Sequence, residues 1–319
     1  MSSADHRFDF GDIDPVELED RATRERQLQQ YSNEALQRAA QVEQVYVLFP
    51  QFGICLAACD RAFQLSRALN TPQGILITGA PGTSKTTIAK YFISSLPQSD
   101  LFEKGFGALL IRLRNSPTTT HVVSALLRAL RYPFVSVRRN NVHAMRDLCF
   151  ESIRQRGTRL IFFDQAHCLS HRPVRSKKDV DETTVSDLLT EMMDETGASL
   201  CLLADSQFQG LEAVDRALAD RVTTREVLEH FRKDEIWAAF LNAFARQTKA
   251  IDLSCLSTPE LQAQTHSATH GNRRQLRRLL VEATLVAVDA QSAAIDRSHL
   301  STAFSRVTGT GNQAANPYG

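Results

Sequence analysis

Apolar residues in the middle of the chain form short continuous runs, and these runs are separated by segments with helical spacing. The runs predict strands over residues 74–78, 107–113, 158–164, 198–205 and 221–228. Continuous apolar strands that alternate with helices are typical of a parallel sheet covered on both faces. The pattern therefore predicts an α/β fold built on a parallel sheet.

Helical spacing, with apolar residues three and four positions apart, fills the segments around these runs. In the first two thirds of the chain it predicts helices over residues 14–41, 49–69, 118–130, 141–156, 185–196 and 208–220. From about His230 onward no strand pattern remains, and four helices are expected over residues 232–247, 257–270, 272–291 and 296–307. A small all-helical unit should therefore follow the sheet.

Composition narrows the class of protein only a little. The 319 residues are 43% apolar and 23% charged, which is ordinary for a globular protein with a sizeable core. Lys and Arg number 37 against 36 for Asp and Glu, so the net charge of +1 neither supports nor excludes nucleic-acid binding. No apolar run reaches the ~18 residues of a membrane span. The polar N-terminus and the scattered cysteines predict a cytoplasmic protein with reduced thiols.

A glycine-containing turn between the first apolar run and the next helix has the spacing of a phosphate-binding loop. Residues 79–86 read GAPGTSKT. Such a turn presents successive backbone N–H groups and a helix N-terminus to an anion. The loop predicts that ATP is held by Gly79, Ala80, Pro81, Gly82, Thr83, Ser84, Lys85, Thr86 and Thr87. Lys85 would reach the β- and γ-phosphates, and Ser84 stands where glycine is usual.

The third apolar run ends in a carboxylate about 80 residues after the loop, in LIFFDQAH. Asp164 and the Thr86 hydroxyl are the expected Mg²⁺ ligands. The next residue, Gln165, stands where a catalytic glutamate is usual. An amide can orient water by hydrogen bonding, but it cannot accept a proton as a carboxylate does. ATP hydrolysis should therefore be very slow.

These residues resemble the AAA+ ATPases. PQGILITGAPGTSKTTIAKYF and LIFFDQAH carry the general resemblance, and LIRLRNSPTTTHVVSALLRALRYP is similar to transposition regulators of the TniB/TnsC type. The family implies an AAA+ P-loop parallel sheet flanked by helices, followed by a small helical lid. The expected divisions are an N-terminal helical extension (1–49), the nucleotide-binding domain (50–229), the lid (230–307) and a flexible tail (308–319).

The resemblance also implies roles for polar residues that follow the later strands. In LLADSQF, Asp205 or Ser206 matches the first sensor. In ALADRVTTREVL, Arg221 matches the arginine finger best and Arg216 is second. The plainer alternative for Arg221 is a surface salt bridge. In HGNRRQLRRLL, Arg274 matches the second sensor, with Arg273 as the runner-up and a basic helix face as the alternative.

Because an arginine finger acts on the nucleotide of a neighbouring subunit, the family implies a ring or filament with ATP between subunits. It further implies duplex DNA along the inner surface, together with a transposase and a target-selecting partner.

The most basic stretch of the sequence lies between residues 128 and 156, which contain seven arginines and only two carboxylates. We expect Arg138, Arg139 and Arg146 to contact DNA phosphates, with 172–178 as a second basic loop. No aromatic residues interleave for base stacking, so binding should follow the backbone and not the sequence. A solvated charged face is the alternative.

Two other functions share parts of this pattern. A replication initiator or helicase loader has the same core motifs, but it would usually add a winged-helix domain after the lid. A protein-remodelling or signalling NTPase would usually carry repeats or a substrate-binding domain. The glutamine at 165 also has two possible origins: a natural binding switch, or a deliberate substitution of the catalytic glutamate.

Overall fold

The computed structural model describes residues 31–69, 72–96, 107–133, 135–170, 184–309 and 315–319. Its centre is a five-stranded parallel sheet with the strand order β2-β3-β4-β1-β5. The strands are β1 (Gly74–Gly79), β2 (Ala108–Arg112), β3 (Leu160–Asp164), β4 (Ser199–Asp205) and β5 (Thr224–Leu228). The predicted parallel α/β fold is confirmed, with every expected strand present.

The register of the strands decides which residues meet at the carboxyl edge of the sheet. Gly79 at the end of β1 lies opposite Asp205 of β4, and Arg112 at the end of β2 lies opposite Asp164 of β3. Parallel pairing therefore brings these four strand ends to the carboxyl edge of the sheet. Ligands of open α/β sheets bind at this edge.

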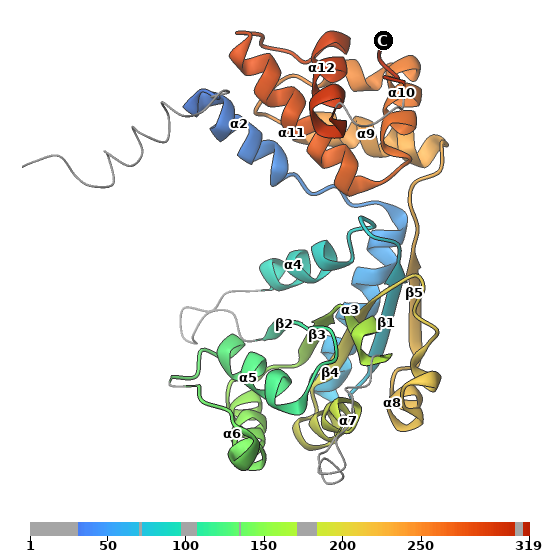
Figure 1. The fold of residues 1–319 in the computed structure, drawn as a ribbon. Coiled ribbons are helices and arrows are strands. Elements are labelled where there is room, and N and C mark those ends of the chain that lie inside the picture. The colour runs from blue at the N-terminus through green and yellow to red at the C-terminus, as the bar shows by residue number, and fades with distance from the viewer. Residues whose placement is uncertain (1–30, 70–71, 97–106, 134, 171–183, 310–314) are drawn as a thin grey trace, which may run out of the picture.

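Alternate strand residues divide the core into two layers, one on each face of the sheet. Ile75 and Ile77 face α3 (Pro50–Ala68) and α4 (Lys85–Ser95), whereas Leu76 faces the opposite layer. The opposite layer is built from α5 (Thr119–Ala129), α6 (Val142–Gln155), α7 (Val185–Thr196) and α8 (Arg216–Arg221). Figure 1 shows this arrangement, with α4 between the sheet and the C-terminal helices.

One predicted helix is broken. The segment 208–220 forms a 3-10 turn over Leu211–Ala213 and then the short helix α8. Asp215 lies between them, and its Oδ1 accepts a hydrogen bond from the Leu218 backbone N–H at 2.8 Å. A residue that caps the start of a helix has a non-helical backbone conformation, so the preceding helical turn cannot continue through Asp215.

The C-terminal helices form a separate layer above the carboxyl edge of the sheet. They are α9 (Glu235–Gln247), α10 (Pro259–Thr269), α11 (Arg273–Asp289) and α12 (Arg297–Thr308). We call this layer the lid. The four helices predicted after His230 are confirmed.

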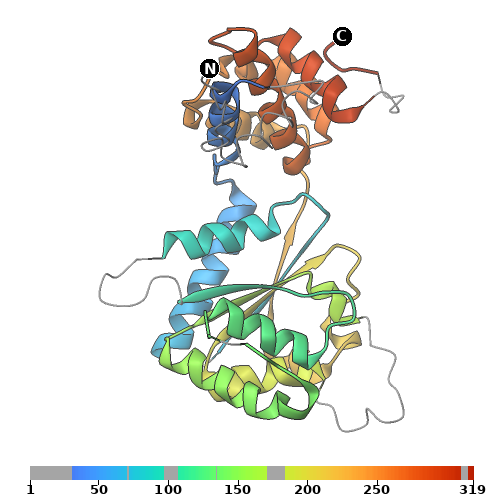
Figure 2. The same cartoon turned by 60° about the vertical axis from the view of Figure 1, so that its left-hand side comes forward.

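Helix α2 (Asn33–Glu43) packs along α11, so the N-terminal segment joins the lid in space (Figures 1 and 2). Tyr31 donates a hydrogen bond from its hydroxyl to Glu282 Oε1 at 2.8 Å. Ser32 caps α2 by accepting from the Ala35 N–H. The part of the predicted helix 14–41 that precedes residue 31 lies outside the described residues.

The expected flexible tail is wrong for its last residues. Tyr318 is 3% exposed, and its hydroxyl donates to Thr265 Oγ1 at 3.1 Å. Asn316 Nδ2 donates to the Ser301 carbonyl at 2.9 Å. The C-terminal residues therefore pack onto the lid, because the Tyr318 ring is buried there and its hydroxyl has a hydrogen-bond partner.

The cysteine thiols are free, as expected. Five are buried and one is half-buried: Cys55, Cys59, Cys149, Cys168, Cys201 and Cys255, the last being the half-buried one. Among the helices of the described residues, none has the length and apolar character that crossing a membrane requires.

Candidate nucleotide-binding site

The phosphate loop joins the central strand to a helix, as the sequence predicts. β1 ends at Gly79 and α4 begins at Lys85. Gly82 has a φ of +87°, and a Cβ at this position would strike the side-chain amide of Asn272. Both the backbone conformation and this close approach therefore require glycine here. The Thr83 backbone N–H and hydroxyl both donate to the Ala80 carbonyl and tighten the turn.

Ser84 adopts a left-handed conformation, with φ 71° and ψ 21°. Glycine reaches this region without strain, whereas an L-residue does so at a cost of roughly 1–2 kcal/mol. The serine side chain has a partner that glycine would lack, because Arg273 Nε donates to Ser84 Oγ at 3.1 Å. The unusual residue in the loop thus supplies a contact with the lid.

Lys85 turns back over the loop. Its Nζ donates to the carbonyls of Gly79 at 2.5 Å and Ala80 at 3.0 Å. Burial lowers the pKa of Lys85 below its ordinary value, and the neighbouring carboxylates of Asp205 and Asp164 oppose that shift. The ammonium is thus held at the loop by the carbonyls and carboxylates around it.

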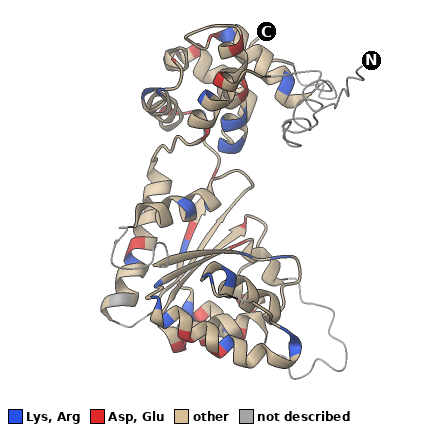
Figure 3. Ribbon diagram, turned by 90° about the vertical axis from the view of Figure 1, so that its left-hand side faces the viewer, with Lys and Arg blue, Asp and Glu red and all other residues tan. Residues whose placement is uncertain are grey.

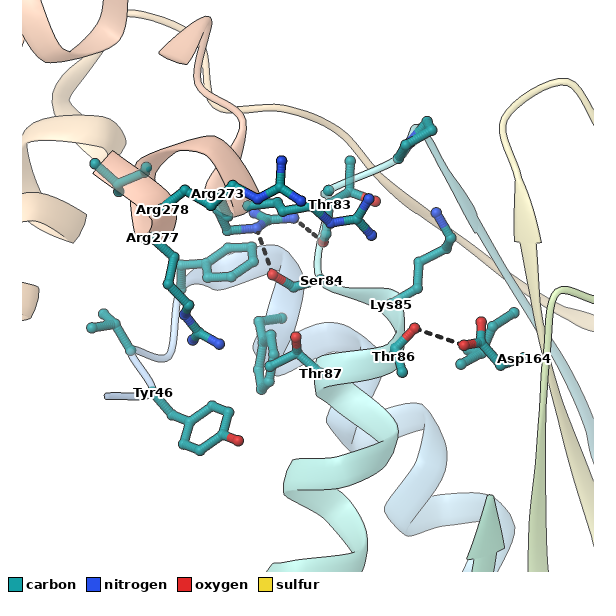
Figure 4. Close-up of a pocket in the computed structure, with 18 of the residues that line it drawn as sticks. Tyr46, Thr83, Ser84, Lys85, Thr86, Thr87, Asp164, Arg273, Arg277 and Arg278 are labelled. Carbon is teal, nitrogen blue, oxygen red and sulfur yellow. Dashed lines mark hydrogen bonds between the residues drawn. The ribbon is translucent and has the colours of Figure 1, made fainter. Parts of the chain in front are cut away.

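The two predicted metal ligands are in contact. The Thr86 hydroxyl donates to Asp164 Oδ2 at 2.9 Å across the gap between α4 and β3 (Figure 4). A hydroxyl and a carboxylate oxygen beside a phosphate loop are the hard donors that Mg²⁺ prefers. The residues therefore fit a magnesium ion that also binds phosphate oxygens.

Gln165 has a positive φ of 61°, and its side chain lies against β2. With the amide oriented to satisfy both of its groups, Nε2 donates to the Leu113 carbonyl at 2.9 Å. Oε1 then accepts from Arg112 Nη2 at 2.8 Å. The amide is therefore fixed by one donor bond and one acceptor bond to β2 and the residue that follows it.

The predicted first sensor lies beside the loop. Asp205 ends β4 and lines the cavity together with Lys85. Its Oδ1 accepts from the Gln207 N–H at 3.1 Å and from the Ser206 hydroxyl at 3.3 Å. Asp205 is therefore the polar tip that reaches the cavity, and Ser206 supports it.

The N-cap and the first residue of the lid helix α11, together with His230 between β5 and α9, contact the backbone of the loop. Asn272 Nδ2 donates to the Pro81 carbonyl at 3.1 Å, and His230 Nε2 lies 3.2 Å from the same oxygen. Arg273 donates from Nη2 to the Thr83 carbonyl, as well as from Nε to Ser84 (Figure 4). The loop and the lid are therefore directly linked.

Arg273 is deeply buried, with 7% of its surface exposed. Its guanidinium carbon lies 4.2 Å from the centre of the Phe49 ring and 5.1 Å from that of Phe231. Burial lowers the pKa of Arg273 to about 9. Arg274, the predicted second sensor, is exposed and lines the same cavity. The structure thus places both candidates at the site and gives them different surroundings.

The cavity above the loop has a volume of about 680 Å³ and is rich in cations. Of the carboxylates that the structure describes, three line it, those of Glu43, Asp164 and Asp205. The cations that line it are Lys85, Arg112, Arg273, Arg274, Arg277 and Arg278. This excess of positive charge suits a polyanionic ligand.

Sequence reasoning missed the far end of this cavity, which the 45–47 segment and α11 enclose. Arg277 Nη2 donates to the Val45 carbonyl at 3.1 Å, and its guanidinium lies 5.6 Å from the centre of the Tyr46 ring. Figure 4 shows Tyr46 and Arg277 on the side of the cavity away from Asp164. No local motif marks a short connection between two helices as part of a site.

The predicted arginine finger lies away from this cavity. Arg221 ends α8 near the amino end of β1, so it is at the opposite edge of the sheet from the loop. Its Nε and Nη2 donate to the carboxylate of Asp194 at 3.0 and 2.7 Å. Arg216, the runner-up, is exposed at the start of the same helix.

The three arginines predicted to contact DNA have different environments. Arg138 and Arg139 are exposed in the connection between α5 and α6. Arg146 differs from the expectation of a free cation, because it is paired with Asp147 and with Glu191, each at 2.9 Å. Figure 3 shows basic and acidic positions side by side along the lower helices of the α/β body. The 172–178 loop lies outside the described residues.

Comparison with known proteins agrees with this geometry. Residues 68–212 match the family described as AAA domain. No curated protein gives a significant match. Two similar solved structures are from Aeropyrum pernix. Its ORC1 protein in complex with DNA has a TM-score of 0.61 at 19% identity, covering 84% of this chain and 69% of that one.

The ORC2 protein of the same organism, in ADPNP–ADP complexes, has a TM-score of 0.60 at 16% identity, covering 83% of this chain and 71% of that one. Cdc6p from Pyrobaculum aerophilum has a TM-score of 0.55 at 15% identity, with coverages of 83% and 69%. Residues 68–212 are therefore similar to the AAA domain family, and the sheet and C-terminal helices of this chain have the AAA+ fold of the ORC and Cdc6 proteins.

Proposed function

We propose that this protein binds ATP with Mg²⁺ and, in that state, assembles as an oligomer on duplex DNA. The observation that carries the proposal is the contact of Thr86 with Asp164 beside Lys85, at the carboxyl edge of the sheet and beneath an arginine-rich lid. A phosphate loop, hard oxygen ligands and an excess of cations fit a nucleoside triphosphate and suit no other common ligand as well.

Each loop residue has a distinct part in holding the nucleotide. Backbone N–H groups from Gly82 to Thr86 would face the phosphates, and Lys85 would exchange its loop carbonyls for phosphate oxygens. Thr86 and Asp164 would hold the metal, which supplies charge neutralisation at the phosphates when bound. The segment around Tyr46 and Arg277 would enclose the base, because it forms the end of the cavity farthest from the metal ligands.

Hydrolysis should be very slow in this sequence. Gln165 follows the metal carboxylate directly, where a general base would have to contact the attacking water. An amide has no basic oxygen, and this one is engaged with Leu113 and Arg112. The ATP-bound state would therefore be long-lived, and the protein would act mainly as an ATP-gated assembly unit.

The finer role we propose is regulation of transposition, in which the oligomer links a target-selecting protein to a transposase. Its support is the similarity of the 110–133 segment to regulators of the TniB/TnsC type. A second candidate is a replication initiator or helicase loader. The fold it shares with ORC1, a protein solved with DNA, favours that candidate.

Electron microscopy with a random duplex tests the proposal. Wild-type protein with ATP should form rings or filaments on the DNA, and protein without nucleotide should not. Lys85→Ala should abolish assembly, because it removes the point charge held against the β- and γ-phosphates. Lys249→Ala, which removes an exposed lid charge, is the matched control and should assemble normally. Unchanged ATP affinity of Lys85→Ala would refute the nucleotide site.

A further inference from the structure

A second cavity of about 330 Å³ lies along the edge strand β2 and the first turns of α5. Residues 111–114, Pro117, His121 and Arg128 contribute to its walls, and we call it the β2–α5 groove. Among the described strands, β2 is the last on its side of the sheet, so the groove lies at the sheet edge. It adjoins the nucleotide cavity, because Arg112 lines both.

The groove is positively charged in the part of the chain that the structure describes. Arg112, Arg114 and Arg128 line it together with His121, and none of the described carboxylates lines it. None of the three arginines forms an ion pair with a carboxylate of the described residues. Several other arginines of the α/β body do, as the pairs of Arg146, Arg154 and Arg221 show. The groove therefore holds cations that the fold itself leaves unneutralised.

Rigid elements present these cations. Arg112 and Arg114 are two positions apart on an extended segment, which places their Cα atoms about 6.6 Å apart on the same side. Leu113 between them is buried, and its N–H donates to the Asp164 carbonyl at 2.9 Å. Arg128 comes from α5, whose buried face includes Leu126 and Leu127. Two elements that both pack into the core thus offer the guanidinium groups.

We propose that the β2–α5 groove binds the phosphates of a nucleic-acid backbone. The proposal rests on the duplex binding proposed above and gives it a location to which the basic stretch 128–156 contributes only Arg128. Guanidinium groups bind phosphate oxygens through paired hydrogen bonds. None of the described residues that line the groove is aromatic, so these residues offer no platform for stacked bases and would contact the backbone alone.

The salt dependence of duplex binding tests the groove. Fluorescence anisotropy with a labelled 30-base-pair duplex would compare wild type with the Arg114→Ala/Arg128→Ala double variant. If each arginine contacts one phosphate, the slope of log affinity against log salt should fall by about 1.8, that is about 0.9 per contact. Neither residue lines the nucleotide cavity, so affinity for a fluorescent ATP analogue should stay unchanged and report an intact fold.

Arg246→Ala/Lys249→Ala is the matched control, since it also removes two exposed positive charges, from the lid. Its slope should equal that of wild type. An equal loss of slope in both double variants would mean a general charge effect and would overturn the groove. The same measurement on Arg138→Ala/Arg139→Ala reports on the contacts predicted from sequence. Loss of slope there, with none in the groove variant, would place the duplex at that loop instead.

Two further outcomes distinguish this proposal from a site for an acidic protein segment and from a failure of the proposed function. If the groove variant keeps its duplex slope but loses affinity for poly-glutamate, the groove binds an acidic protein segment and the nucleic-acid proposal is wrong. If wild type binds no duplex with ATP, the proposed function fails, and the groove assignment fails with it. If wild type binds the duplex and the groove variant binds it equally well, the groove assignment is wrong and the proposed function is unaffected.

Discussion

At residue 165, the difference between an amide and a carboxylate is that only the amide can donate hydrogen bonds. The Gln165 Nε2 group donates to the Leu113 carbonyl, and its oxygen accepts from Arg112. A glutamate in the same place would put a carboxylate oxygen against a carbonyl oxygen. Because two acceptors repel each other, a glutamate should leave that position while keeping its attraction to Arg112. The present side chain is thus held by a bond that the catalytic residue could not make.

We therefore expect Gln165→Glu to raise ATP turnover by about two orders of magnitude, the lower end of the range for general-base catalysis. The measurement is phosphate release in the presence of duplex DNA and Mg²⁺, together with the lifetime of the assemblies, which should shorten. Gln165→Ala provides the comparison, since it breaks the same contacts and supplies no base. Equal rates for the two variants would mean that another residue is the base.

Ser84 provides a test of backbone strain in the loop. Both Ser84→Gly and Ser84→Ala remove the hydroxyl that accepts from Arg273, but only glycine adopts φ 71° without strain. The free energy of unfolding, from chemical denaturation without nucleotide, should therefore be about 1 kcal/mol higher for the glycine variant than for the alanine variant. Equal values would indicate that the loop relaxes away from the left-handed conformation.

The start of helix α11 is the element that connects the phosphate loop to the lid. Asn272 and Arg273 both donate to backbone carbonyls of the phosphate loop, and Gly82 leaves room for the Asn272 amide. A change in loop conformation on nucleotide binding would therefore act directly on α11. Helix α2 and the end of the chain both pack onto the lid, so they would move with it.

Arg273→Lys tests that connection. Lysine keeps the charge but lacks the planar fork that reaches Ser84 and Thr83 together. Hydrogen bonds from charged groups contribute roughly 1.5–3 kcal/mol, so we expect the free energy of unfolding to fall by about 2 kcal/mol. Arg278→Lys, an exposed change on the same helix, should stay within about 0.5 kcal/mol of wild type. Comparable losses in both variants would contradict the assigned role of Arg273.

At the scale of the whole molecule, Arg221 lies too far from its own nucleotide cavity to act within one subunit. To act on a neighbour it would have to leave Asp194, which holds it through two hydrogen bonds. A partly exposed ion pair contributes only ~0–1 kcal/mol, so an incoming nucleotide could replace it. Asp194 would then be a resting partner of the finger.

Arg221→Ala should leave ATP binding by the monomer nearly intact and weaken the ATP-bound oligomer, as sedimentation with ATP would measure. Mixing it with Lys85→Ala should show coupling between subunits. Asp194→Asn is the control, because it breaks the same ion pair and leaves the arginine in place. If both variants assemble equally well, Arg221 is a structural residue and Arg216 becomes the candidate finger.

The sequence by itself determined the sheet and the centre of the site. Its apolar runs set strands β1 to β4, because a strand buried on both faces is apolar along most of its length. The 79–86 turn and the Asp164 strand end predicted residues that the fold does bring together, because phosphate and metal binding need fixed residue types at fixed local spacing. The lid helices could likewise be predicted from the helical periodicity of their apolar residues.

The tertiary structure alone decided what depends on contacts between distant segments. Tyr46 and Arg277 meet only because α11 packs over the 45–47 segment, and no local spacing encodes that contact. Arg146 belongs to a basic stretch in the sequence, yet Glu191 from another helix neutralises it, while Arg114 and Arg128 have no such partner among the described residues. Charge and packing act through space, so the set of unneutralised cations is a property of the fold.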